Sequence, residues 1–200
     1  MDVDPALFAG VEPETARRLL LSAVTAFSAQ GFQAATTREI GERAGLSPAA
    51  VYVYYASKHD LLFEISRVGH EASLAAVVEA LEGASEDPAE RVAAFVRAFA
   101  RWHADNHVLA RVIQYELKNL PPLQFRTIAA SRARFQSLLR DEIAAGAARG
   151  VFRVDEPEET TLAVLSLCID LARWYEPTAE RPSAKIASLY ARLALGMLGG

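Results

Sequence analysis

The sequence predicts an all-α protein of about nine helices, with an N-terminal helix-turn-helix domain and a C-terminal helical domain. Alanine and leucine are abundant, and extended runs of β-branched residues are missing. Residues 31–65 have the pattern of two short capped helices joined by a glycine turn, followed by a third capped start. Loops rich in proline and glycine separate amphipathic segments in the rest of the chain.

The N-terminal segment carries a signal at each expected helix end. Thr36 is followed three residues later by Glu39, which is a capping box. Ser47 precedes Pro48, the favoured pair for an N-cap and a first turn. Gly45 stands where the earlier helix must end, because glycine adopts the left-handed conformation at low cost. These signals predict short helices on either side of Gly45.

The other elements follow in chain order. A first helix is expected over about 13–30, and Ser57 with Asp60 caps a long helix over about 57–82. A further helix starts at Asp87, and later helices are expected over about 106–118, 123–148, 156–175 and 183–198. In the helix over 123–148, Phe125 is expected to face the core.

Two helices joined in this way are how a helix-turn-helix presents one helix to the DNA major groove. The exposed side of the second helix is small, as close approach to DNA requires. The whole chain has a formal net charge of −4, and residues 15–60 are only weakly positive, with five basic against three acidic residues. We therefore expect few phosphate contacts per subunit and moderate salt sensitivity. An all-helical domain with ordinary caps is the alternative.

Residues 14–65 resemble the TetR family of one-component bacterial repressors. The likeness includes the helix from Arg18 to Phe27, the Gly31-Phe32 exit and the ending Tyr52-x-Tyr54-Tyr55-x-Ser57-Lys58. Two positions depart from the family pattern, since Tyr54 is usually histidine and Tyr55 usually phenylalanine. The resemblance implies a DNA-binding domain over residues 1–56, a ligand-binding and dimerisation domain over residues 57–200, and a repressor that a small apolar effector releases from its operator.

Roles at the DNA follow from this resemblance by position. Phosphate contacts are expected at the start of the earlier helix, base-edge contacts along the second helix, and a further phosphate contact from the lysine at the start of the long helix. The small residues have no polar tips, so they can read only methyl groups or DNA shape. The implied DNA-binding residues are Thr36, Thr37, Arg38, Ser47, Pro48, Ala49, Ala50, Tyr52, Tyr54 and Lys58.

The last two helices indicate a homodimer. The segment from Thr161 to Leu171 is apolar almost all round, so every face of it needs a cover. A similar four-helix interface joins TetR subunits, and a twofold axis suits a palindromic operator. A centrally buried helix in a monomer is the alternative. The expected interface residues are Leu162, Leu165, Ile169, Ile186, Leu189 and Leu193.

Aromatic residues on different helices suggest an apolar effector cavity, although plain core packing explains each of them equally well. The expected ligand-binding residues are Phe99, Trp102, Tyr115, Phe135 and Trp174. The segment from Ala172 to Pro177 resembles a TetR subgroup of fatty-acid and sterol catabolism whose members respond to acyl-CoA thioesters. That resemblance makes Arg132, Arg134 and Arg173 candidates for the phosphates. A hydrophobic effector without CoA is the alternative.

Other chemistry finds little support in the sequence. His103 and His107 have the spacing of a metal pair, but two solvated histidines are the expectation, so no metal site is predicted. No catalytic motif and no cofactor motif is present, and an enzyme or a protein–protein interaction module remains a less favoured class. Cys168 lies in an apolar helix and is expected to be inert. One cysteine, an acidic N-terminus and no long apolar run together predict a cytoplasmic protein that is not in the membrane.

Overall fold

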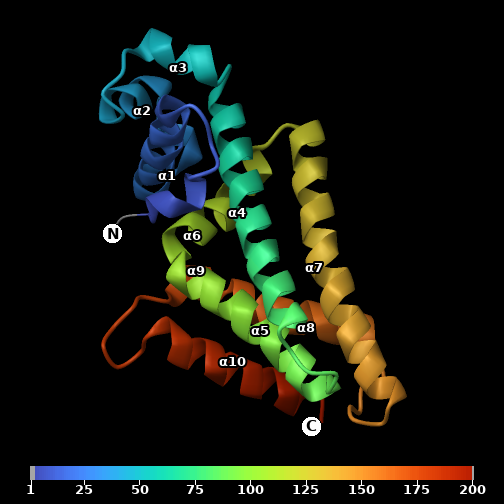
Figure 1. Ribbon diagram of the computed structural model, residues 1–200. Helices are drawn as coiled ribbons and strands as arrows, with labels where there is room; N and C mark the ends of the chain where they lie inside the picture. Colours follow the sequence, from blue (N-terminus) through green and yellow to red (C-terminus); the bar gives the residue numbers. More distant parts are fainter. Residues whose placement is uncertain (1–2, 200) are drawn as a thin grey trace. The chain divides into compact units, whose positions relative to one another are not determined.

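The computed structural model describes residues 3–199, which form helices, turns and loops, while Met1 and Asp2 of the acidic N-terminus lie outside the described residues, as does Gly200. Within this range the only bridge of β type is an isolated one between Thr178 and Arg181. The helices, drawn in Figure 1, are α1 (Glu14–Ala34), α2 (Thr37–Arg43), α3 (Pro48–Tyr54), α4 (Lys58–Glu82), α5 (Pro88–Asp105), α6 (His107–Glu116), α7 (Pro122–Ala148), α8 (Pro157–Ile169), α9 (Leu171–Trp174) and α10 (Ser183–Met197), with short 3-10 turns at Pro5–Phe8 and Leu117–Asn119.

The all-α prediction is confirmed. The predicted helix over 156–175 is interrupted at Asp170, which separates α8 from the single turn α9. Phe125 was expected to face the core, but 42% of it is exposed, so that prediction is wrong. It lies in the first turn of α7, where helical spacing gives too few residues to fix which face is buried. Within residues 3–199, none of the helices combines the length and apolar character that a membrane span requires.

The chain folds into two compact units, each made of two stretches of sequence. The first unit comprises Met1–Ala72 and Val108–Ala129, and the second comprises Ser73–His107 and Ala130–Gly200. Helices α4 and α7 contribute residues to both units.

In the first unit, α1, α2 and α3 share a small core. Leu20, Ile40 and Val51 are fully buried in it, one from each helix. The two short helices approach closely at Gly41, where an added Cβ would lie 2.9 Å from Cγ2 of Val51. Glycine in the interior of α2 therefore has a packing reason that outweighs its low helix propensity.

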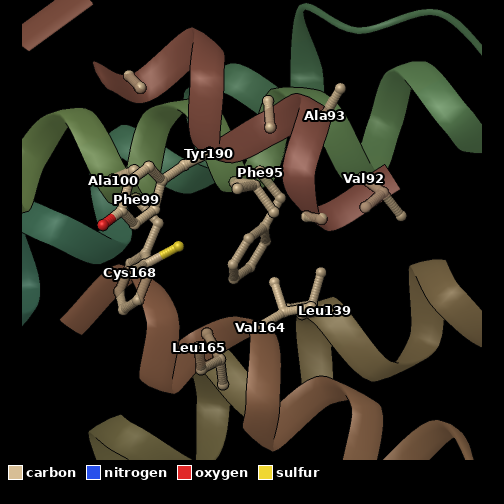
Figure 2. Close-up of a cluster of buried hydrophobic side chains, with 14 of the residues drawn as sticks. Val92, Ala93, Phe95, Phe99, Ala100, Leu139, Val164, Leu165, Cys168 and Tyr190 are labelled. Carbon is tan, nitrogen blue, oxygen red and sulfur yellow. The ribbon is translucent and has the colours of Figure 1, made fainter. Parts of the chain in front are cut away.

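The second unit is built around α5, which packs against α8 and α10. Figure 2 shows Phe95 of α5 pointing toward Leu139 of α7 and Val164 of α8, and all three side chains are fully buried. The paired hydrogen bonds from Arg91 to the carboxylate of Glu142, both 2.7 Å, join α5 to α7. A large apolar cluster and one partly buried ion pair thus hold this unit together.

Candidate DNA-binding and effector sites

The predicted caps of the helix-turn-helix are present. The Thr36 hydroxyl accepts the N–H of Glu39 at 3.2 Å, and the Glu39 carboxylate accepts the N–H of Thr36 at 3.0 Å. The N–H of Thr36, together with its hydroxyl, which donates to the Glu39 carboxylate at 2.9 Å, lowers the pKa of Glu39. The Ser47 hydroxyl accepts the N–H of Ala50 at 3.2 Å, and Gly45 has φ +70° in the turn. Each local signal of the sequence therefore forms the contact that its spacing predicts.

The outward face of α3 is exposed and partly aromatic. Tyr52 is 54% exposed and Tyr54 is 39% exposed, while Pro48 and Ala49 are also exposed. Val53 is 77% exposed, more than the tyrosines on either side of it. Val53 was not among the predicted site residues, although its position four residues after Ala49 places both on one helix face.

Polar groups of α2 lie beside this face. The hydroxyls of Thr37 and Tyr52 share a hydrogen bond of 2.9 Å, which places two hydroxyls together at the junction of α2 and α3. Arg38 is exposed and forms an ion pair of 2.8 Å with Glu42. An exposed ion pair contributes little to stability, so the Arg38 guanidinium can leave the Glu42 carboxylate and bind a phosphate instead.

Lys58 has partners inside the first unit. Its ammonium donates to the backbone carbonyls of Phe32, Gln33 and Ala35 at 2.5, 3.2 and 2.8 Å. It also lies 4.4 Å from the ring centre of Phe32. Burial lowers the pKa of Lys58, and the nearby Glu116 opposes this shift. Lys58 therefore closes the end of α1, where Gly31 with φ +80° breaks the helix.

Other cations of the helix-turn-helix also have internal partners. Arg17 donates to the carbonyl of Ala9, and Arg18 donates to the carbonyl of Ala44 at the end of α2. Such contacts to carbonyl oxygens leave the charge in place but commit the side chain to holding the fold. Because Arg17 and Arg18 hold the fold, the exposed face of α2 and α3 offers hydroxyl groups, such as those of Thr37 and Tyr52, beside the exposed Arg38.

The segment Val108–Ala129 reaches the helix-turn-helix through polar contacts. Gln33 at the end of α1 donates to the side chain of Asn119 at 2.7 Å, and Asn119 in turn donates to the Glu116 carboxylate at 2.8 Å. Gln124 of α7 donates to Asp60 at 2.7 Å in the first turn of α4. Sequence reasoning missed these contacts because their partners lie 86 and 64 residues apart.

The second unit brings together three of the five predicted effector residues. Phe99 and Phe135 are buried with ring centres 4.9 Å apart, and His103 lies 4.4 Å from Phe99 on one side and 5.2 Å from Trp102 on the other. The indole N–H of Trp102 is buried and, among the described residues, has no hydrogen-bond acceptor. An unsatisfied buried donor is unfavourable until something supplies an acceptor.

The other two predicted effector residues are not among the buried residues of this cluster. Trp174 is about one-third exposed beside Tyr175, and Tyr115 belongs to the first unit, where it is half exposed. Tyr175 and His107 help to line an open pocket of about 390 Å³ between the end of α5 and the loop that precedes α10. The motif from Ala172 to Pro177 thus contributes to the wall of a pocket.

The two histidines do not match their prediction. His103 and His107 were expected to be solvated, but they are only 8% and 6% exposed. Their Nδ1 atoms form hydrogen bonds with the carbonyls of Phe99 and Ala104, so tertiary packing has made them core residues. Among the described residues, no group of three potential ligands is placed to hold a metal ion.

The candidate phosphate-binding arginines differ in environment. Burial lowers the pKa of Arg132, whereas Arg134 is exposed. Arg173 is exposed and forms an ion pair of 2.7 Å with Asp170. Cys168, by contrast, is buried in the core (Figure 2), and burial raises the pKa of its thiol to about 12, as expected for an inert cysteine.

The expected interface residues fall into two groups. Leu162, Leu189 and Leu193 are 46%, 38% and 46% exposed, so they offer apolar surface on α8 and α10. Leu165 and Ile186 are each 6% exposed within their own core, and Ile169 packs against that core. The first group has the largest side-chain surface available to a partner, while Ile169 is only partly exposed.

Two family models match the chain, one described as bacterial regulatory proteins of the tetR family over residues 19–65, and one as the tetracyclin repressor-like C-terminal domain over residues 85–198. The transcriptional repressor KstR2 of Mycolicibacterium smegmatis is 24% identical over 180 residues, which cover 89% of this chain and 87% of that protein. The structure of a tetR-family regulatory protein from Rhodococcus RHA1 superposes with a TM-score of 0.87 at 39% identity, covering 93% of this chain and 97% of that one.

The structure of AibR in complex with isovaleryl coenzyme A and operator DNA has the same fold, with a TM-score of 0.80 at 19% identity and coverage of 92% and 97%. The C-terminal family model alone spans more than half of the chain. The chain therefore belongs to the TetR family of bacterial regulatory proteins, which are DNA-binding regulators and not enzymes.

Proposed function

We propose that α3 enters the major groove of a palindromic operator and that α2 and the two tyrosines hold the flanking phosphates. The observation that carries this proposal is the exposed face of α3, mounted on a small core by caps at both short helices. Residues 1–56 act as the DNA-binding domain, and residues 57–200 bind the effector and the second subunit. The protein works in the cytoplasm, where operator DNA is accessible.

The DNA contacts are assigned to the ten residues predicted from sequence, with one change of emphasis. The hydroxyls of Tyr52 and Thr37 share one hydrogen bond, which leaves one hydroxyl hydrogen to donate to a phosphate. Lys58 acts mainly by closing the end of α1, so its effect on DNA is partly indirect.

The test is Tyr52→Phe, which removes one hydroxyl and keeps the ring. Duplexes selected by the protein from a randomised pool serve as the probe. We expect affinity to fall about fivefold to thirtyfold, as the loss of a phosphate hydrogen bond in each half-site of a dimer predicts. Tyr55→Phe is the matched control, because Tyr55 is half buried and its hydroxyl faces the carbonyl of Ala16. Unchanged affinity for Tyr52→Phe would contradict the assignment.

We propose that the effector is a small apolar compound and that an acyl-CoA thioester is the first class to test. The buried aromatic cluster around Phe99 offers an apolar environment. The Trp102 N–H has no acceptor within residues 3–199, and a thioester carbonyl would supply one. The pocket beside Tyr175 has a volume typical of a ligand site. AibR, which shares the fold, binds isovaleryl coenzyme A in its own structure.

Native mass spectrometry of the purified protein tests the effector class, because it identifies a copurified small molecule by mass. A panel of acyl-CoA thioesters, starting with isovaleryl-CoA, is then titrated against the protein–DNA complex. Release by a thioester but not by free CoA supports the acyl-CoA proposal. Release only by an apolar compound without CoA supports the alternative, and Trp102→Phe should then weaken release only where the compound carries an acceptor.

We propose that α8 and α10 form the dimer interface through Leu162, Leu189 and Leu193, with Leu165, Ile169 and Ile186 supporting them from within the subunit. Leu193→Asp places a charge on this surface and should convert the dimer to a monomer in sedimentation. Leu123→Asp is the control, because Leu123 is 70% exposed on α7, outside the proposed interface. A dimer that persists in Leu193→Asp at micromolar concentration would move the interface elsewhere.

Effector binding is proposed to favour a dimer with its two α3 helices too far apart for successive major grooves, which lie roughly 34–36 Å apart. Helix α4 contributes to both compact units, and α4 is the proposed transmitting element. Helix α7 also contributes to both units, and Gln124 in its first turn donates to Asp60 of α4 within the first unit. The shift can be no larger than the effector's difference in affinity for the two states.

A further inference from the structure

We propose that Val53, together with Ala49 and Ala50, reads the 5-methyl groups of thymines in each operator half-site. This inference rests on the proposed insertion of α3 into the major groove. It names thymine as the base that α3 selects. Val53 is the residue that determines specificity, because at 77% it has the largest exposed fraction of the large apolar side chains that the described residues of α3 show.

The arrangement follows from the helical turn of about 100° per residue. Val51 points inward and is fully buried, so the opposite side of α3 faces outward. Around that side, the order is Tyr52, Ala49, Val53, Ala50 and Tyr54. A strip of methyl groups therefore runs along the middle of the exposed face, with one tyrosine on each side.

This strip can make no hydrogen bond through its side chains. Guanine presents two acceptors in the major groove, and cytosine presents an N–H donor. Pressed against methyl groups, these polar atoms would lose water without gaining a partner. Thymine instead presents a methyl group, which packs well against alanine and valine. The flanking tyrosine hydroxyls remain available for phosphates or for an acceptor on the base edge.

The test removes methyl groups from either partner: the single 5-methyl group from a thymine, or both methyl groups from Val53. Duplexes are first selected by the wild-type protein from a randomised pool. The best duplex is then synthesised with deoxyuridine in place of thymidine at one symmetric pair of positions at a time. Each duplex is titrated with wild-type protein and with Val53→Ala. Leu123→Ala is the matched control, because Leu123 is 70% exposed on α7, away from α3.

At one symmetric pair of thymines, deoxyuridine should weaken wild-type binding about fourfold per half-site and about fifteenfold for the dimer, as burial of one methyl group predicts. Val53→Ala should bind the thymidine duplex about as weakly as the wild-type protein binds the deoxyuridine duplex. This variant should no longer distinguish the two duplexes. Leu123→Ala should behave as wild type. Equal melting temperatures for the wild-type protein and both variants exclude a folding defect.

Two results overturn the proposal: wild-type affinity within twofold across the whole deoxyuridine scan, or undiminished discrimination by Val53→Ala. If the pool yields no enriched duplex at all, the proposed operator binding itself fails, and this inference fails with it. The enrichment step therefore separates failure of the proposed function from failure of the methyl readout.

Discussion

The helix-turn-helix and the second unit are both helical, but different interactions hold them together. The first has a small apolar core whose helix ends are fixed by polar contacts: side-chain caps at Thr36 and Ser47, and the Lys58 ammonium on backbone carbonyls at the end of α1. The second is fixed by a continuous apolar cluster in which Phe95 and Phe135 contact residues far away in sequence. Polar interactions fix the surface that we propose for DNA binding, while apolar burial supplies the bulk of the stability of the second unit.

The sharpest contrast is expected from truncating the core of the second unit. Phe95→Ala removes a fully buried ring and leaves a cavity, so the free energy of unfolding should fall by about 3–5 kcal/mol. Phe125→Ala removes the same group from an exposed position and should change the free energy of unfolding by no more than about 0.5 kcal/mol. Chemical denaturation measures both values, and equal losses would mean that the aromatic cluster is not the stabilising core.

A smaller effect is expected from Lys58→Met, which keeps the stem and removes the ammonium. Three carbonyls lose a charged donor, and partial solvation limits the cost to about 1–2 kcal/mol of unfolding free energy. Lys118→Met, at an exposed lysine, should leave stability unchanged.

The same variant separates an internal role for Lys58 from a phosphate contact. If Lys58 acts through the end of α1, the slope of log affinity against log salt concentration should match that of wild type. A slope lower by about one per subunit, with stability retained, would instead show a direct phosphate contact.

The closeness of α2 and α3 gives a third test. Gly41→Ala gains helix propensity but forces Cβ within 2.9 Å of Cγ2 of Val51, and overpacking should dominate with a net loss of about 1 kcal/mol. Adding Val51→Ala should recover part of the Gly41→Ala loss, because the clash is then gone. Gly10→Ala, in open space, should be neutral within about 0.5 kcal/mol. A stabilised Gly41→Ala variant would contradict the close packing.

The same contrast explains what the sequence could reveal. The caps at Thr36, Ser47 and Asp87 and the turn at Gly45 could be predicted because both partners lie within a few residues of each other. The burial of His103 and the internal partners of Lys58 could not, because they depend on packing between distant segments. Val53 was overlooked because an apolar residue in a short helix is ordinarily assigned to the core. The aromatic residues of the second unit are ambiguous for the same reason, since a core and a ligand cavity need the same side chains.

The smallest expected effect concerns Cys168. Burial raises the pKa of its thiol to about 12, so at pH 8 the native protein should not react with a thiol reagent such as Ellman's reagent until it unfolds. Because folding favours the protonated thiol, the contribution of this group to stability is complete below the unfolded pKa of about 9 and is lost as the pH rises toward 12. Ser28→Cys, at an exposed position on α1, should react at once and serves as the control. Rapid labelling of native Cys168 would mean that the apolar core opens readily, and the contrast between a polar, surface-held helix-turn-helix and a tightly packed second unit would then be lost.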